Sequence, residues 1–378
     1  MSELGKNIIS LIIGLFLAFV IVEGILRLYN PIEQRIKGDK IVLPVNKKYI
    51  FRKVNINGVD DPVVHTKNSL GFRGPELPSG GLDDYISIIT IGGSTTECSL
   101  LSDGKDWPAV LYKNLHTDFE NIWLNNAGLD GHSTFGHIIL MEDYIVKLKP
   151  TLVLFLIGIN EVGITNPTKH DELVIRGGVR LSSFKDFVKS LSLYSETVSL
   201  ALNLFRWAKA KVRGLTHHNV DLRALPQVNY PDPGLDSLLE FHRSQYIPGF
   251  YKRLKMLIHL AKANGIEPVF ITQPALFGYG TDDRTQVDLG RIQIDRYSGN
   301  TKWKILELYN NSMIEAGKSF DVFVIDAAHE MKKSSRNFYD FVHFTNEGAR
   351  KFGNIVYRHL KKHLKETYSK KLRQQKMD

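Results

Sequence analysis

The chain has 378 residues, of which 43% are hydrophobic and 24% are charged. This balance excludes a disordered chain and suffices for one large folded domain, or for a domain that carries an insertion. The formal net charge of +9 favours an anionic neighbour such as a phospholipid surface, an acidic glycan or nucleic acid. Cys98 is the single cysteine, which excludes an intramolecular disulfide and a cysteine-based metal cluster.

The amino terminus reads as a single-pass membrane anchor over residues 1–29. Residues 8–22 carry no charge, and with the apolar positions 24–26 the stretch approaches the roughly 20 residues that a spanning helix needs. A buried helix and a cleaved signal peptide are the alternatives. The segment is apolar on all faces and no small-x-small site follows it, so an uncleaved anchor is favoured. Four basic residues between 27 and 40 outnumber Lys6, a count that would leave the following domain in the cytoplasm.

Residues 30–84 read as an extended connector. They are rich in Pro, Gly, Asn and Asp, with only short extended runs, so we expect them to wrap the domain without a core of their own. Residues 68–74 form a compact, turn-like stretch. Arg73 within it is interpreted as one half of a structural salt bridge, with a role at the rim of an active site as the alternative.

From residue 85 to 366, apolar strand-like runs alternate with helical patterns. This alternation predicts an α/β domain with a doubly wound parallel sheet and helices on both faces. The run Leu152–Ile157 has no polar interruption, as a strand covered on both faces requires. Predicted strands lie at 86–91, 121–126, 151–157, 267–272 and 321–325, and predicted helices at 107–115, 134–148, 250–263, 302–316 and 346–364.

Three stretches depart from this alternation. Residues 165–245 are too long for a connection and contain an amphipathic helical segment at 184–211, which predicts a lid over the strand ends or, alternatively, a helix on the membrane surface. Residues 274–300 read as a loop at the active site. The basic tail at 367–378 reads as a solvated run that could add affinity for a membrane or polyanion.

One turn organises the candidate chemistry. The buried run that starts at Ile86 ends in Gly92-Gly93, so Ser94 is expected at the carboxyl edge of the sheet, where ligands bind in open α/β folds. Asp340 and His343 lie between the last strand and the last helix, and therefore at the same edge. A serine needs a base to take its proton, and a carboxylate that orients the imidazole makes that base effective. Seen alone, the Gly-Gly-Ser stretch would be interpreted as an ordinary turn, and the Asp340–His343 stretch as hydrogen bonds at the start of a helix.

Two other strand ends offer donors for an oxyanion. They are the glycine-containing turn at 126–131 and the stretch 158–161, which contains Asn160. A fixed backbone N–H and a carboxamide are the groups that stabilise a tetrahedral intermediate. Four ends of one sheet would thus deliver a nucleophile, two donors and a base.

These four stretches resemble the conserved blocks of the SGNH, or GDSL-type, serine hydrolases. The first block resembles residues 91–95 and implies Ser94 as nucleophile, with its N–H as one oxyanion donor. The second resembles residues 126–131 and implies Gly131 as a donor, with Gly128 as second choice. Gly93 and Glu161 stand where the family commonly has aspartate.

The remaining two blocks complete the resemblance. The third resembles residues 158–161 and implies Asn160 as the side-chain donor, and the fifth resembles residues 340–343, implying His343 as base and Asp340 as its partner. The family implies a flavodoxin-like sheet. It also implies hydrolysis of a carboxylic ester through an acyl-enzyme, on an O-acyl group of a cell-surface glycan or on a lipid ester.

The chain resembles membrane-anchored bacterial members whose first block reads Gly-Gly-Ser-Thr-Thr. Such members often act outside the cytoplasm, which implies an extracytoplasmic, periplasmic domain, against the charge count. An O-acyltransferase with the same machinery and a non-catalytic binding protein on this fold are the alternatives, and the oligomeric state stays open. No cofactor is expected, because no P-loop ending follows Ser94, and no nucleic-acid motif accompanies the positive charge. No metal is expected, because His132, His137 and the pair His217-His218 lack ligand spacing and read as ordinary surface or core histidines.

Overall fold

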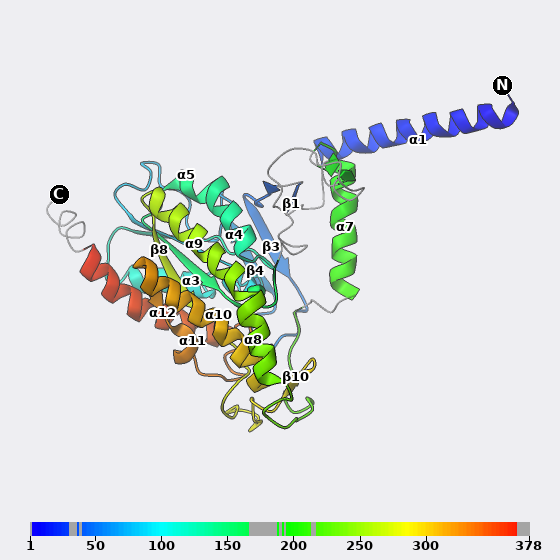
Figure 1. Ribbon diagram of the computed structural model, residues 1–378. Coiled ribbons are helices and arrows are strands. Elements are labelled where there is room, and N and C mark those ends of the chain that lie inside the picture. The colour runs from blue at the N-terminus through cyan, green and yellow to red at the C-terminus, as the bar shows by residue number, and fades with distance from the viewer. Residues whose placement is uncertain are drawn as a thin grey trace. The chain divides into compact units, whose positions relative to one another are not determined.

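The computed structural model describes residues 2–29, 36–37, 40–165, 187–188, 191–192, 194–212 and 217–368. The chain forms two compact units (Figure 1). The smaller comprises residues 1–44 and 172–216, and the larger comprises residues 45–171 and 217–378. Within the stretch expected to be an insertion, 165–245, residues 166–186, 189–190, 193 and 213–216 lie outside the described residues. The basic tail is described only as far as residue 368.

The smaller unit contains α1 (Glu3–Leu28), a helix long and apolar enough to cross a membrane, with a mean hydropathy of 2.7. A helix with these properties can also be a signal sequence. Residues 36–37 and 40–41 form a short antiparallel ladder, β1–β2. The helix α7 (Glu196–Val212) contacts α1. The carboxylate of Glu23 accepts hydrogen bonds from the backbone N–H groups of Glu196 and Thr197, each at 3.0 Å. Because the first N–H groups of a helix have no partner inside it, Glu23 caps α7.

The larger unit is built on a five-stranded parallel sheet. Its order, β11-β8-β7-β5-β6, places β6 on one side of β5 and β7 on the other. The direction of winding therefore reverses between β5 and β7, and such a switch point leaves a crevice at the carboxyl ends of the two strands. The five strands are β5 (Ile86–Gly92), β6 (Ile122–Asn126), β7 (Leu152–Ile157), β8 (Glu267–Thr272) and β11 (Phe323–Ile325). The predicted flavodoxin-like order is thus observed.

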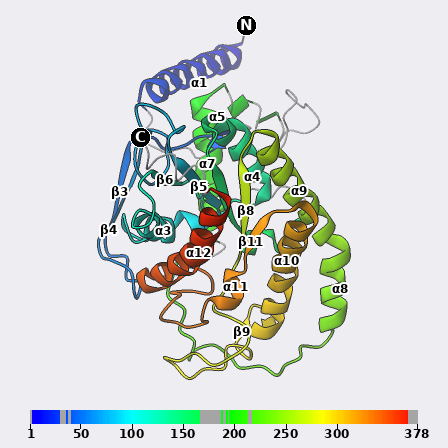
Figure 2. The same ribbon diagram turned by 90° about the vertical axis from the view of Figure 1, so that its left-hand side faces the viewer.

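Helices cover both faces of this sheet, as Figure 2 shows. Every residue of β5, β6 and β7 is buried, which explains why β5 and β7 are largely apolar. One face carries α3 (Trp107–Leu115), α11 (Ala327–Glu330) and α12 (Asn346–Thr367). The other carries α4 (Thr134–Leu140), α9 (Ile247–Ala263) and α10 (Gly299–Phe320), with α8 (Leu235–Gln245) packed on α9 and α10. The predicted α/β class, with helices on both faces, is confirmed.

Local capping explains where several helices begin. The Asp106 carboxylate accepts the Ala109 N–H at 3.2 Å and starts α3, and the Thr345 hydroxyl accepts the Gly348 N–H at 3.0 Å and starts α12. The predicted helix at 302–316 begins earlier, at residue 299, because the Ser298 hydroxyl caps it. The predicted helix at 134–148 contains a π-helical stretch, η1 (Met141–Ile145), before α5 (Val146–Leu148).

The segment before the sheet is more ordered than its composition indicates. Within the stretch expected to be an extended connector, β3 (Lys47–Phe51) and β4 (Val63–Lys67) pair as an antiparallel hairpin. Arg73 exchanges two backbone hydrogen bonds with Asn126, at 2.7 and 3.0 Å, and so joins this segment to the end of β6. The stretch expected to be an active-site loop, 274–300, contains the small hairpin β9–β10 (Gln293–Ile294 and Tyr297–Ser298).

Candidate active site

Ser94 begins the short helix α2 (Ser94–Glu97) directly after β5, at the switch point of the sheet. The turn needs both glycines before it. A Cβ on Gly92 would lie 2.2 Å from the Thr96 hydroxyl oxygen and 2.6 Å from the Leu156 carbonyl oxygen, and a Cβ on Gly93 would lie 2.3 Å from the Asn160 side-chain nitrogen. A side chain at residue 93 would meet the Asn160 carboxamide, so glycine at this position lets the carboxamide pack against the turn that carries Ser94.

His343 lies at the Ser94 hydroxyl, although 249 positions separate the two residues in the chain. Its Nε2 atom is 2.7 Å from Ser94 Oγ, and its Nδ1 atom is 2.6 Å from a carboxylate oxygen of Asp340. An ionised carboxylate only accepts hydrogen bonds, so Nδ1 carries the proton and Nε2 is free to accept the serine proton. This is the relation between nucleophile, base and orienting acid that serine hydrolases use.

The Asp340 carboxylate is held in its ionised form. Burial alone would raise its pKa, but the hydrogen bond and charge of His343 and the backbone N–H groups of Val342 and His343 outweigh burial and keep the pKa below its ordinary value. Those two N–H groups donate to the second carboxylate oxygen at 2.9 and 2.7 Å. Both carboxylate oxygens are thus engaged, which fixes the rotation of the acid against the imidazole.

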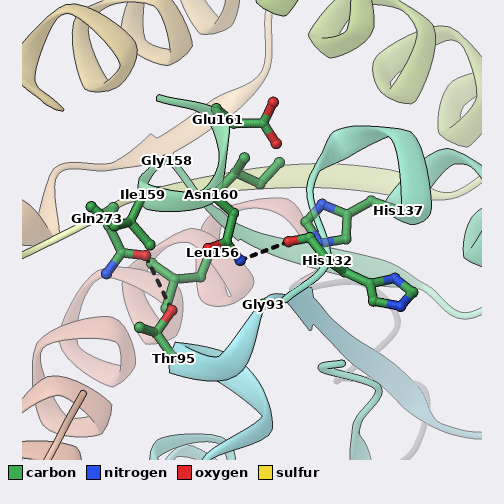
Figure 3. A pocket seen from close by; sticks show the side chains of 11 residues that line it. Gly93, Thr95, His132, His137, Leu156, Gly158, Ile159, Asn160, Glu161 and Gln273 are labelled. Atoms are coloured by element: carbon green, nitrogen blue, oxygen red, sulfur yellow. Dashed lines mark hydrogen bonds between the residues drawn. The ribbon is translucent and has the colours of Figure 1, made fainter. Parts of the chain in front are cut away.

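Asn160 lies on the other side of the switch point, in the 3-10 turn η2 (Ile159–Glu161) after β7. Its Nδ2 atom donates to the backbone oxygen of His132 at 2.9 Å, as Figure 3 shows, and packs over Gly93. An amide nitrogen has two hydrogens, so one remains for a ligand beside Ser94. Asn160 was predicted from the sequence as an oxyanion donor, and in the structure its amide lies next to the turn that carries Ser94.

Gly131 and Gly128 differ in what their N–H groups do. The Gly128 N–H donates to the Asn126 side chain at 2.9 Å and is therefore already engaged in this structure. Gly131 has a φ of 74°, and its N–H makes no hydrogen bond within the described residues. The Ser94 N–H, the first of α2, likewise has no partner in this part of the chain, as expected for a helix start.

A buried ion pair stands behind Asn160. The Glu161 carboxylate is fully buried and accepts hydrogen bonds from the Arg253 guanidinium at 2.9 Å and from the Thr134 backbone N–H at 2.5 Å. Arg253 also donates to the Thr134 hydroxyl at 2.6 Å. Burial raises the pKa of Glu161, and the charge of Arg253 opposes that rise. These contacts tie η2 to α4 and α9. Figure 3 shows the Glu161 carboxylate turned away from Gly93.

The space between these elements is small. Gly93, Thr95, His132, Asn160 and Gln273 line a cavity with room for about one water molecule. The Thr95 hydroxyl donates to the Gln273 side chain at 3.1 Å across one end of it (Figure 3). The turn that carries Ser94 is therefore braced from β8 as well as from β7.

Two other residues from the sequence have structural roles. Arg73 is buried and donates to the backbone oxygens of Glu97, Cys98 and Leu101, each within 2.9 Å, which fixes the end of α2. Its ion pair with Asp106, at 3.1 Å, bears out the interpretation as a structural salt bridge. His132 contributes its backbone oxygen to Asn160, while His343 occupies the position at the serine hydroxyl.

His217 was interpreted from the sequence as an ordinary histidine, and the structure places it at the site. Its ring centroid lies 4.4 Å from that of His343. Ligand atoms of His217, Asp340 and His343 lie within 4.8 Å of one another, a spacing that could attract a metal ion. His343 is already hydrogen-bonded to Asp340 through Nδ1 and to Ser94 through Nε2, so an ion would have to displace at least one of those hydrogen bonds. No signal in the sequence links His217 to the other three residues.

No protein-family model matches the chain, and no curated protein matches it. Solved structures are similar to it at low identity. An α/β hydrolase enzyme from the metagenome of Lake Arreo, Spain, shares 13% identity over 72% of this chain and 94% of its own, with a TM-score of 0.41. The acetyl xylan esterase AlAXEase shares 15% over 72% and 98%, with a TM-score of 0.38. An acetylxylan esterase from Geobacillus stearothermophilus shares 13% over 72% and 91%, with a TM-score of 0.39.

Proposed function

We propose that this protein hydrolyses a carboxylic ester through an acyl-enzyme on Ser94. The observation that supports the proposal most directly is the chain of two short hydrogen bonds, 2.7 Å from Ser94 Oγ to His343 Nε2 and 2.6 Å from His343 Nδ1 to Asp340. A serine hydroxyl is a weak nucleophile without such a base. The position of the three residues at the switch point of a parallel sheet supports the same proposal, because ligands bind there.

The reaction would begin when Ser94 Oγ attacks the ester carbonyl and His343 Nε2 takes the hydroxyl proton. The negative charge on the carbonyl oxygen would be stabilised by the N–H groups of Ser94 and Gly131 and by the second Asn160 amide hydrogen. One such donor lowers the barrier by roughly 3 kcal/mol. His343 would then pass its proton to the departing alcohol oxygen. A water deprotonated by His343 would attack the acyl group and release the acid and the free serine.

The substrate that we propose is an O-acyl ester of a cell-surface glycan or of a lipid. The apolar length of α1 supports a membrane anchor, which would keep the enzyme close to such substrates. The resemblance to membrane-anchored bacterial hydrolases supports an extracytoplasmic, periplasmic domain, and the basic residues after α1 argue for the opposite orientation. Reporter fusions at the carboxyl terminus decide between the two. Activity of an alkaline phosphatase fusion supports export, and fluorescence of a cytoplasmic reporter alone overturns it.

Labelling with a fluorophosphonate probe tests the catalytic proposal. Wild-type protein should be labelled, while Ser94→Ala should lose labelling completely and His343→Ala should lose nearly all of it. Ser102→Ala serves as a control, because the Ser102 hydroxyl accepts the Val64 N–H outside the site. Equal labelling of the wild type and Ser94→Ala would sink the proposal.

A panel of acetyl, butyryl and long-chain esters then gives the acyl preference. The same assay, with a glycan acceptor added, separates hydrolysis from acyl transfer. Free acid alone supports the hydrolase. Acylated acceptor as the main product, formed in a Ser94-dependent way, would replace it with an O-acyltransferase.

A further inference from the structure

His217 is a second imidazole beside the proposed base, and the proposed mechanism does not use it. Its ring meets the ring of His343 edge-on, with centroids 4.4 Å apart and planes at 67°. Tyr339 packs against both residues: its ring stacks on His343 at 5.7 Å, and its hydroxyl lies 2.8 Å from His217 Nδ1. The three side chains form one aromatic cluster at the base side of the site.

Tyr339 determines which nitrogen of His217 carries the proton. Burial raises the pKa of Tyr339 well above its usual range, so the hydroxyl keeps its hydrogen. Within the described residues, that hydroxyl lies 2.8 Å from His217 Nδ1. We assign the hydroxyl as the donor in this contact, because a buried phenol hydrogen needs an acceptor and Nδ1 can accept only when it is unprotonated. With this assignment, neutral His217 carries its proton on Nε2.

His217 stays neutral in this environment. Burial lowers its pKa, and the neighbouring His343 lowers it further because two imidazolium ions cannot be adjacent without repulsion. A neutral imidazole whose Nδ1 is occupied presents a fixed N–H donor at Nε2, with no cost of reorientation when a ligand arrives.

The contacts of His217 place it beside the proposed base. Its ring meets that of His343, whose Nε2 atom lies 2.7 Å from Ser94 Oγ. One ligand atom from each of His217, Asp340 and His343 lies within 4.8 Å of the other two. In the proposed reaction, His343 passes its proton to the departing alcohol, so a donor beside His343 lies on the alcohol side of the ester.

We propose that His217 is a specificity-determining residue whose Nε2–H donates a hydrogen bond to an oxygen on the alcohol portion of the ester. This inference rests on the proposed function. It assigns the substrate class as an ester of a polyhydroxylated alcohol, such as a sugar, rather than of a simple hydrocarbon alcohol. A site built to hydrogen-bond a substrate oxygen discriminates strongly against an analogue that lacks it, because the donor is then left unpaired.

Two acetate esters of matched shape test this assignment. One is methyl glucoside acetylated on its primary hydroxyl, and the other is cyclohexylmethyl acetate, which has the same ring size and no hydroxyls. For His217→Phe we expect kcat/KM on the sugar ester to fall roughly 10- to 100-fold, mainly through KM, and kcat/KM on the cyclohexyl ester to change less than about 3-fold.

Two further variants keep the test independent of folding. His217→Gln retains an N–H near the position of Nε2 and should recover most of the preference for the sugar ester. Tyr339→Phe removes the hydroxyl that fixes the tautomer of His217 and should give an intermediate loss of the preference for the sugar ester. His218→Phe is the matched control, because this neighbouring imidazole is exposed, and it should leave the preference unchanged.

The outcomes separate this inference from the proposed function. A ratio of the two kcat/KM values that His217→Phe leaves unchanged, with turnover still dependent on Ser94, overturns the role of His217 alone. An equal loss on both esters, or a failure of His217→Gln to restore the preference, also overturns it. Absence of Ser94-dependent turnover of either ester by the wild type overturns the assigned substrate class, and only the further absence of Ser94-dependent fluorophosphonate labelling overturns the ester hydrolase itself.

Discussion

Two Asp-x-x-His pairs lie between β11 and α12 in the larger unit, and only one of them meets a serine. In both pairs a carboxylate holds Nδ1 of the imidazole, at 2.6 Å for Asp340–His343 and at 2.8 Å for Asp326–His329. The opposite nitrogen of His343 lies 2.7 Å from Ser94 Oγ, whereas that of His329 lies 3.4 Å from a carboxylate oxygen of Glu307. The His343 side chain is 18% exposed and that of His329 is 47% exposed.

The difference shows that the pair itself carries little information about catalysis. Asp326 follows the edge strand β11 and occupies the N-cap position of α11, so its pair belongs to a helix start. His343 meets the turn between β5 and α2, where the sheet reverses its winding and the Asn160 amide is close. The place in the fold, rather than the spacing of the two residues, separates a candidate base from a surface histidine.

Substitution of the aspartate in each pair should give the largest difference in kcat between the two pairs. Asp340→Asn should lower kcat about 10⁴-fold, because a carboxamide can donate to Nδ1 and then favours the wrong tautomer of His343. Asp326→Asn, which alters the same contact in the exposed pair, should leave kcat unchanged. Hydrolysis of a chromogenic acetate ester measures both. Comparable losses in the two variants would contradict the assignment of His343 as base.

A smaller loss in kcat should follow removal of the Asn160 amide, a hydrogen-bond donor that lies near the Asp340–His343 pair. Asn160→Ala should reduce kcat roughly 10²- to 10³-fold with little change in KM, because the amide acts on the charge of the transition state. Asn114→Ala provides the control, since Asn114 is bonded to Asn354 between α3 and α12. A change in KM with kcat intact would show that Asn160 binds substrate instead.

The support behind Asn160 should matter less for turnover and more for folding. Glu161→Gln leaves the buried Arg253 without its counter-charge, and we expect a loss of roughly 3–5 kcal/mol in the free energy of unfolding. Loosening of η2 should cost about 10-fold in kcat. The double variant Glu161→Leu with Arg253→Met removes both charges and should regain stability in urea unfolding. A double variant as unstable as the single one would show that the pair contributes more than charge balance.

The smallest effect is the response of the two pairs to pH. The hydrogen bond to Asp326 raises the pKa of His329, so the folded state binds that proton more tightly. Its stabilisation is fully present below the unfolded pKa of about 6.5 and is lost as the pH rises through the folded pKa. Because the pair is exposed, the contribution should be below about 1 kcal/mol.

The lowered pKa of Asp340 gives the opposite sign. Its stabilisation is present above the unfolded pKa and is lost as the pH falls through the folded value. Urea unfolding of the wild type, His329→Gln and Asp340→Asn over a range from about pH 2 to pH 9 measures both trends. A slope at alkaline pH that persists in His329→Gln would assign it to another group.

The elements that place Ser94 and His343 could be predicted because their signals are local. The first signal is an apolar run that ends in two glycines, and the second is an Asp-x-x-His motif before a capped helix. Each signal is contained within a few consecutive residues. The strand order could be expected from the alternation of elements and from the resemblance to a family. Glu161 stood out in the sequence only as a departure from that family.

Other parts of the site could not be predicted, because their contacts join distant segments through burial. Arg253 is buried on the face of α9 that also carries Phe250 and Leu257, and nothing in its spacing pairs it with Glu161. His217 precedes His343 by 126 positions in the sequence. The role that we propose for His217 depends on its contact with the Tyr339 hydroxyl. The choice between Gly131 and Gly128 depends on one hydrogen bond to the Asn126 side chain, which no sequence pattern specifies.

The bonds from Glu23 to the first turn of α7 affect how this protein should be prepared for study. Purification commonly begins by deleting an apolar leader to obtain a detergent-free sample. Here a chain starting at Tyr29 would lack the carboxylate that occupies the Glu196 and Thr197 amides, and the Arg27 guanidinium 2.5 Å from the Tyr194 carbonyl oxygen would be gone as well. Excising the leader would thus uncap an internal helix more than 160 positions downstream, and a full-length sample in micelles or nanodiscs is the safer material for enzymology.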